Sequence, residues 1–112
     1  MAFKGDLDAL ILGVLQSKPS HGYDISKSIR EMSQDALRLG EGQLYPALHK
    51  LEHSGLIVAE WQQQTGKPAK KIYAITEQGA ARLESLRKEW QKFATGVGAV
   101  LNLTLAEVKP HA

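Results

Sequence analysis

A proline inside an otherwise helix-like run constrains the fold of this 112-residue chain more than any other feature. The run is EGQLYPALHKLEHSGLI, residues 41–57, and its proline is Pro46. Proline is tolerated in the first turn of a helix, where the backbone amides have no partner within the helix. The sequence therefore predicts a helix that begins near Gln43 or Leu44. Its end is expected at Ser54-Gly55, because glycine commonly follows a helix C-terminus.

This predicted helix has one apolar and one polar face. Projected at 100° per residue, four apolar side chains gather on one side and are expected to face a core: Leu44, Ala47, Leu48 and Leu51. The opposite side is rich in hydrogen-bonding groups and carries, with Gln43 at its edge, Tyr45, Pro46, His49, Lys50 and His53. A helix of this kind, stiffened at its first turn, suits end-first insertion into the major groove of DNA.

Two interpretations of the polar face remain open. In the first, Lys50 reaches a DNA phosphate and Gln43 or His49 reaches a base edge. Tyr45 and Pro46 would then pack on a sugar or a thymine methyl group. In the second interpretation, Pro46 only marks the start of the helix and Tyr45 packs on a neighbouring element.

The elements on either side are predicted from periodicity and capping residues. Apolar residues at positions 7, 10, 11, 14 and 15 indicate a first helix, with Asp6 as its N-cap. Ser20 is expected to cap a second helix over residues 21–32, in which Ile25, Ile29 and Met32 share a face. Residues 57–64 and 71–76 indicate a β-hairpin. Its loop, residues 65–70, is expected to be longer than a two-residue turn and to project with its lysines.

A long last helix is expected to follow Thr76, which is a good N-cap residue. Its apolar residues are spaced 3, 4, 3, 4 and 3 apart, as in a heptad-like seam: Leu83, Leu86, Trp90, Phe93, Val97 and Val100. Gly96 and Gly98 weaken a helix interior, so fraying or a kink is expected after Ala94. Residues 104–112 are expected to be a disordered tail.

The order of these elements predicts the fold class. Three short helices, a β-hairpin and a long helix make a mostly α protein with a small β-hairpin, in the plan of a winged helix-turn-helix domain. We expect this domain to span residues 1–76, and the C-terminal helix to span residues 77–103.

Charge and composition narrow the class of function. Residues 65–92 hold seven basic and three acidic side chains, a local balance of +4 in a chain whose net charge is +2. A basic segment suggests contact with a polyanion, although a solvated charged face explains the charge equally well. As a wing, the hairpin would bring Lys67, Lys70 and Lys71 to the DNA backbone. Ser20, His21 and Tyr23, at a helix N-terminus, are further candidates for phosphate contact.

Several other classes are excluded or disfavoured. The chain has no cysteine, and no segment has the roughly 20 apolar residues needed to cross a bilayer, so we expect a cytoplasmic protein. His49 to His53 spells the H-x-x-E-H pattern of one class of zinc protease. However, catalytic zinc needs a third protein ligand, and no recognisable motif supplies one. We therefore expect neither an enzyme nor a metal or cofactor site.

Six segments in the same order give the chain a specific resemblance to the PadR family of transcriptional regulators. They are ALILGVL at residues 9–15, HGYDI at 21–25, GQLYPAL at 42–48, LEHSGLI at 51–57, GKPAKKIY at 66–73 and ITEQG at 75–79. The resemblance spans residues 7 to about 93. The Gly-x-Leu-Tyr-Pro element with its downstream Gly-Leu-Ile is the most specific part, whereas the leucine-rich first segment is weak.

The resemblance implies a homodimeric winged-helix protein that binds double-stranded DNA, usually as a repressor. It implies that the last helix makes the dimer, with Leu83, Leu86, Trp90, Phe93 and Val97 in the interface. It also places Gln43, Tyr45, Pro46, His49 and Lys50 on the recognition helix. The chain departs from the family in two respects. It has wing lysines where arginine is common, and its last helix is short, as in the smaller subfamily with one C-terminal helix.

Two alternatives remain beside this hypothesis. Trp90 and Phe93 form part of a dimer core, or they line a pocket between subunits for a small planar apolar effector. The whole protein is a DNA-binding repressor acting on an inverted-repeat operator, or it is a winged-helix adaptor for another protein. Binding to nonspecific duplex DNA at low salt would separate these last two functions.

Overall fold

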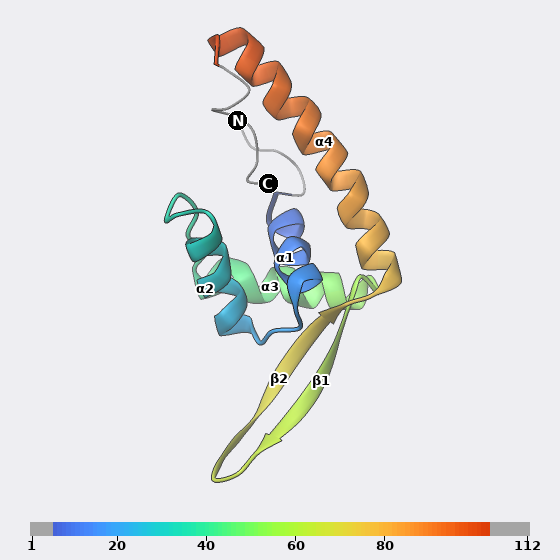
Figure 1. Ribbon diagram of the computed structural model, residues 1–112. Coiled ribbons are helices and arrows are strands. Elements are labelled where there is room, and N and C mark those ends of the chain that lie inside the picture. The colour runs from blue at the N-terminus through green and yellow to red at the C-terminus, as the bar shows by residue number, and fades with distance from the viewer. Residues whose placement is uncertain (1–5, 104–112) are drawn as a thin grey trace.

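The computed structural model describes residues 6–103, which form four helices and one two-stranded antiparallel sheet (Figure 1). The elements follow the order α1 (Asp6–Ser17), α2 (Gly22–Met32), α3 (Glu41–His53), β1 (Ile57–Gln64), β2 (Lys67–Ile75) and α4 (Glu77–Leu101). This order confirms the predicted winged helix-turn-helix domain with a C-terminal helix. The predicted tail, residues 104–112, lies outside the described residues.

The core lies where the three short helices meet the base of the hairpin and the first half of α4. The apolar face predicted for α3 is confirmed, because Leu44, Leu48 and Leu51 are fully buried and Ala47 is half-buried. Ile25 and Ile29 of α2 are buried as expected. Met32 lines the same surface hollow as Ile29, as the shared face predicts, but its side chain is largely exposed at the end of α2.

α3 begins earlier than the proline suggests. Its N-cap is Gly40, and the Gly40 carbonyl accepts hydrogen bonds from the amides of Gln43 and Leu44 at 3.1 and 3.0 Å. The predicted start near Gln43 or Leu44 is therefore wrong, and Pro46 is the sixth residue of the helix. The first helical bonds form ahead of Pro46, which removes only the bond that an amide at this position would give to Gly42.

The hairpin is longer and its turn tighter than predicted. β2 begins at Lys67, and Lys67 pairs with Gln64 across the two residues Thr65 and Gly66. The positive φ of Gly66, 71°, lets the chain reverse in this short space. The predicted six-residue loop is thus wrong. Pro68 is tolerated in the strand because the register is irregular opposite it, between Gln62 and Gln64.

The hairpin is anchored to the segment ahead of α2. Ser20 and Tyr73 form an antiparallel bridge in which each backbone amide donates to the other carbonyl, at 3.0 and 2.9 Å. The Ser20 hydroxyl donates to the carbonyl of Lys18. The prediction that Ser20 caps α2 is wrong, since the N-cap is His21 and has no side-chain capping bond.

α4 runs unbroken from Glu77 to Leu101 and has two different environments along its length. Thr76 caps it as predicted, accepting a hydrogen bond from the amide of Gly79 at 3.0 Å. Leu83 and Leu86 are buried in the core of the same chain, so their assignment to a dimer seam is wrong. Beyond them the helix extends away from the body, on the side opposite to the hairpin tip (Figure 1). The fraying expected after Ala94 does not occur, because the helix continues to Leu101.

Candidate nucleic-acid interface

The polar face of α3 is open to solvent. All five predicted recognition residues have exposed side chains: Gln43, Tyr45, Pro46, His49 and Lys50. The buried leucines on the opposite side of the helix fix which way this face points. The pattern therefore gives the outward face of α3 correctly even though it misplaces the start of the helix.

Tyr45 joins this face to the N-terminus of α2. A Cβ atom on Gly22 would lie 2.8 Å from both Cε1 and the hydroxyl oxygen of Tyr45, so the ring rests directly on the glycine backbone. Tyr45 is still partly exposed beyond this contact. The interpretation that Tyr45 packs on a neighbouring element is confirmed, and the side chain also remains on the outer surface. It also explains why glycine occupies the centre of the His21-Gly22-Tyr23 segment.

The hairpin meets the same helix N-terminus. Lys70 Nζ lies 3.3 Å from Nε2 of His21, and that nitrogen lies 3.0 Å from a carboxylate oxygen of Asp24. The His21 nitrogen donates to Asp24 or accepts from Lys70, depending on its tautomer. The ring of the exposed Tyr23 stacks near His21, with centroids 6.3 Å apart. Cationic and aromatic side chains from α2 and β2 therefore gather beside α3.

Lys71 is half-buried, and its ammonium points toward α3. Its Nζ donates to a carboxylate oxygen of Glu52, in the last turn of α3, at 3.3 Å. The ammonium also lies 6.0 Å from the ring centroid of Trp61 and 5.4 Å from that of Tyr73. Burial alone would lower the pKa of Lys71, but Glu52 and Tyr73 outweigh it, so the pKa lies above its ordinary value.

The predicted wing and phosphate residues thus differ in their surroundings. Lys67 is exposed beside the turn and, within residues 6–103, has no side-chain partner. Ser20 is only 4% exposed, so its hydroxyl is not presented to a ligand outside the domain. Trp61 of β1 is a further exposed aromatic side chain beside Lys71, for which the sequence pattern predicts no role. The sequence signal for this side chain is a tryptophan on the strand that leads, four residues later, into the hairpin turn.

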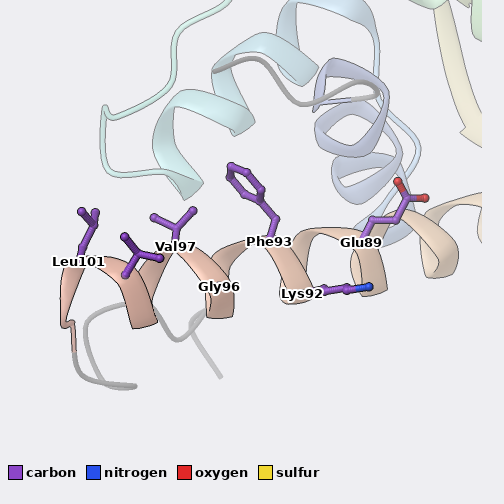
Figure 2. Close-up of a pocket in the computed structure, with 7 residues that line it drawn as sticks. Glu89, Lys92, Phe93, Gly96, Val97 and Leu101 are labelled. Carbon is purple, nitrogen blue, oxygen red and sulfur yellow. The ribbon is translucent and has the colours of Figure 1, made fainter.

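The outer half of α4 carries an apolar face. Phe93, Val97 and Leu101 point to one side of the helix, as Figure 2 shows, and they line an open hollow with Glu89, Lys92, Gly96 and Val100. Trp90 meets Phe93 edge to face, with ring centroids 5.5 Å apart, but does not line the hollow. Both the dimer core and the pocket between subunits that were considered for Trp90 and Phe93 require a second copy, so they stay predictions.

Metal binding and membrane insertion find no support in the described residues. Among residues 6–103, no three side chains of histidine, aspartate or glutamate converge in a group able to hold a metal ion. No helix in the same range has the length and apolar character needed to cross a membrane.

Known proteins share both the sequence pattern and the fold. Residues 11–85 match the sequence profile described as "Transcriptional regulator PadR-like family". An uncharacterized protein of Lysinibacillus sphaericus is 33% identical over 87 residues, which are 78% of this chain and 80% of that protein. The negative transcriptional regulator PadR of Bacillus subtilis is 34% identical over 73 residues, 65% of this chain but only 40% of that protein. The solved structure of a transcriptional regulator from Clostridium thermocellum aligns with a TM-score of 0.74 at 30% identity, covering 88% of this chain and 92% of that one.

Proposed function

This chain belongs to the PadR-like family of transcriptional regulators, and from that premise we propose that it is a repressor that binds an inverted-repeat operator as a homodimer. The observation that carries the proposal is the exposed polar face of α3, flanked by the basic hairpin and the N-terminus of α2. The family assignment agrees with the expectation that the protein is a regulator rather than an enzyme. Repression is supported by the Bacillus subtilis relative, which is a negative transcriptional regulator.

In the proposed complex, the exposed face of α3 enters the major groove. Gln43 and His49 offer hydrogen-bonding groups to base edges, and Lys50 offers a charge to phosphate. Tyr45 and Pro46 present flat apolar surface near the first half of the helix, suited to a sugar or a thymine methyl group. The leucines beneath hold this face outward and make it rigid.

The hairpin supplies the flanking contacts in this proposal. Lys67 beside the turn and Lys70 near α2 are exposed cations that would lie along the DNA backbone. His21 and Tyr23 extend the same surface onto α2. Ser20 is left out of the proposed interface because it is buried and bonded within the chain.

The proposed dimer uses the outer half of α4. Phe93, Val97 and Leu101 share one side of that half, outside the core of the domain. A second copy covering this face would bury apolar surface and relate two α3 helices by a twofold axis. Two half-sites would then lie about 34 Å apart, one turn of DNA.

The main test is selection of bound duplexes from a random pool, followed by titration of the selected operator over a range of salt. Lys50→Ala and Lys70→Ala should each weaken binding and reduce the slope of log K against log salt by about 0.9 for each phosphate contact that is removed. Lys88→Ala, an exposed lysine on α4, is the matched control and should leave the slope unchanged. Equal slopes for all four proteins would remove these two lysines from the phosphate contacts.

The same selection decides between the regulator and the winged-helix adaptor. An inverted repeat among the selected sequences would support the homodimeric regulator. Recovery of no preferred sequence, together with no nonspecific duplex binding at low salt, would favour the adaptor instead.

A small planar apolar effector remains part of the proposal through Trp90 and Phe93. Two copies of the apolar side of α4 would bring four aromatic rings near the twofold axis, where they could enclose a flat ligand. A Trp61→Phe variant leaves Trp90 as the single tryptophan reporter. Absence of any fluorescence change with a panel of planar aromatic compounds would favour a plain dimer core.

A further inference from the structure

The Glu52–Lys71 ion pair connects the two elements that the proposed function places on DNA. Glu52 lies in the last turn of α3 and Lys71 lies in β2 of the hairpin. The two side chains are 35% and 30% exposed, so the pair is shielded from solvent more than an ordinary surface pair. It is therefore placed to fix the angle of the hairpin against the recognition helix.

Because of its position in α3, the Glu52 carboxylate is stabilised by a nearby cation. The C-terminal end of a helix carries a partial negative charge, which disfavours a carboxylate in the last turn. Lys71 offsets this charge from the neighbouring strand at 3.3 Å. Loss of Lys71 leaves the Glu52 carboxylate without a neighbouring cation. Loss of Glu52 leaves the Lys71 ammonium without its anion.

The strand geometry explains why Lys71 points inward. Lys71 and Tyr73 are two residues apart in β2 and thus lie on the same face of the strand. Tyr73 is buried, and Trp61 is the cross-strand neighbour of Lys71. The Lys71 ammonium therefore lies near both aromatic rings while it donates to Glu52 of α3.

The adjacent lysine holds the hairpin to α2 instead. Lys70 contacts His21, at the N-terminus of α2, while Lys71 contacts Glu52, at the end of α3. Successive residues of one strand thus reach two different helices. Together with the Ser20–Tyr73 bridge, these contacts fix the root of the hairpin from both sides.

We propose that Glu52 and Lys71 are positioning residues for DNA binding, which hold the hairpin at the angle that lets it and α3 contact one duplex together. This inference rests on the proposed function. Lys71 then acts on affinity through the hairpin rather than through a phosphate. A hairpin already fixed in its bound orientation loses less conformational freedom on binding.

The test compares Glu52→Gln, Lys71→Gln and the double variant, using fluorescence anisotropy of the selected operator. Glu52→Gln removes a negative charge, so simple attraction to DNA predicts tighter binding, whereas positioning predicts weaker binding. We expect each single variant to bind about two- to fivefold more weakly. The double variant should bind no more weakly than the single variants, because both remove the same pair.

Two controls separate positioning from a phosphate contact and from general destabilisation. Glu60→Gln makes the same charge change at an exposed position of β1 and should bind at least as well as the wild type. The salt slope should stay unchanged in Lys71→Gln, since removal of a phosphate contact would reduce it by about 0.9. Lys71→Arg keeps the cation and should restore most of the affinity.

A second readout follows the hairpin directly. In a Trp90→Phe background, Trp61 is the single tryptophan and is 65% exposed. Glu52→Gln should lower the anisotropy of its emission, because Lys71 links the Glu52 carboxylate to this ring. A loosened hairpin produces this change, whereas a simple loss of charge does not.

The outcomes distinguish the two proposals. Equal or tighter operator binding by Glu52→Gln, or a lower salt slope in Lys71→Gln, would overturn the positioning role and leave the proposed function intact. Absence of duplex binding by the wild-type protein would overturn both.

Discussion

The contact between Gly22 and Tyr45 can be tested with one substitution, Gly22→Ala. Its effect on the free energy of unfolding should depend on whether Tyr45 is present. Gly22→Ala would place a methyl carbon 2.8 Å from two atoms of the Tyr45 ring system and 3.0 Å from a third. Ordinary contact begins near 3.4 Å, so the ring must retreat by about 0.6 Å. Because Tyr45 is partly exposed, the ring can move outward, away from α2.

The energetic cost of this movement is modest and can be bounded. A side chain displaced from its preferred rotamer costs about 0.5–1.5 kcal/mol. Alanine opposes this, since it restricts the unfolded chain more than glycine does, by up to about 1 kcal/mol within a helix and less at its first residue. We expect Gly22→Ala to lower the free energy of unfolding by up to about 1 kcal/mol. In a Tyr45→Ala background the same change should be neutral or stabilising.

The assay is denaturant unfolding of the four proteins in this cycle at one fixed protein concentration, which keeps any association constant. The interaction energy between the two positions should be about 0.5–1.5 kcal/mol. Operator affinity should also fall in Gly22→Ala, because the displaced Tyr45 changes the shape of the α3 surface. Effects that add within about 0.3 kcal/mol would refute the contact as the reason for glycine here.

Three other predictions concern the core, the ion pair and base recognition. Leu86→Ala, at a fully buried position, should lower the free energy of unfolding by about 2–5 kcal/mol at every protein concentration. Leu101→Ala, at a position 62% exposed, should instead make the midpoint of thermal unfolding depend more steeply on protein concentration. A steeper concentration dependence in Leu86→Ala than in Leu101→Ala would show that Leu86 lies in the dimer interface. The raised pKa of Lys71 means that its stabilising contribution is complete below pH 10.5 and is lost as pH rises through the folded-state pKa. The stability difference between wild type and Lys71→Gln should therefore be constant from pH 7 to about 10 and shrink above that, as denaturant titrations would show. Gln43→Ala or His49→Ala should change the preferred operator bases at a cost of roughly 1–3 kcal/mol for each base contact removed; repeated selection with an unchanged consensus would argue against base contacts from these side chains.

Local patterns in the sequence determine the elements and their inward faces. The leucines at helical spacing in residues 44–51 predict which side of α3 is buried, because only one side can meet the core. Thr76 predicts the start of α4, since its hydroxyl can satisfy an amide of the first turn. Ser54-Gly55 predicts the end of α3, and the positive φ of Gly55, 78°, agrees with that role.

Features that depend on distant partners could not be predicted in this way. The heptad-like spacing of Leu83 and Leu86 shows that one side of α4 is apolar, but not whether the same chain or a second copy covers it. The direction of the Lys71 side chain depends on the strand register, which a two-residue turn sets. The Gly-Lys-Pro sequence is typical of a longer loop, so this turn was not predicted. The Tyr45–Gly22 contact joins residues 23 positions apart, beyond the reach of any local period.

The continuity of α4 has a mechanical consequence. Leu83 and Leu86 set its root into the domain, and the helix continues from Leu83 to Leu101 over roughly 27 Å at 1.5 Å per residue. Such a rod behaves as a lever, so a tilt of about 5° at the Leu101 end moves the domain at the other end by roughly 2 Å over that length. In the proposed complex with DNA, this displacement is roughly two thirds of the ~3.4 Å rise of one base pair, so slight repacking at the Leu101 end would shift α3 measurably along the duplex.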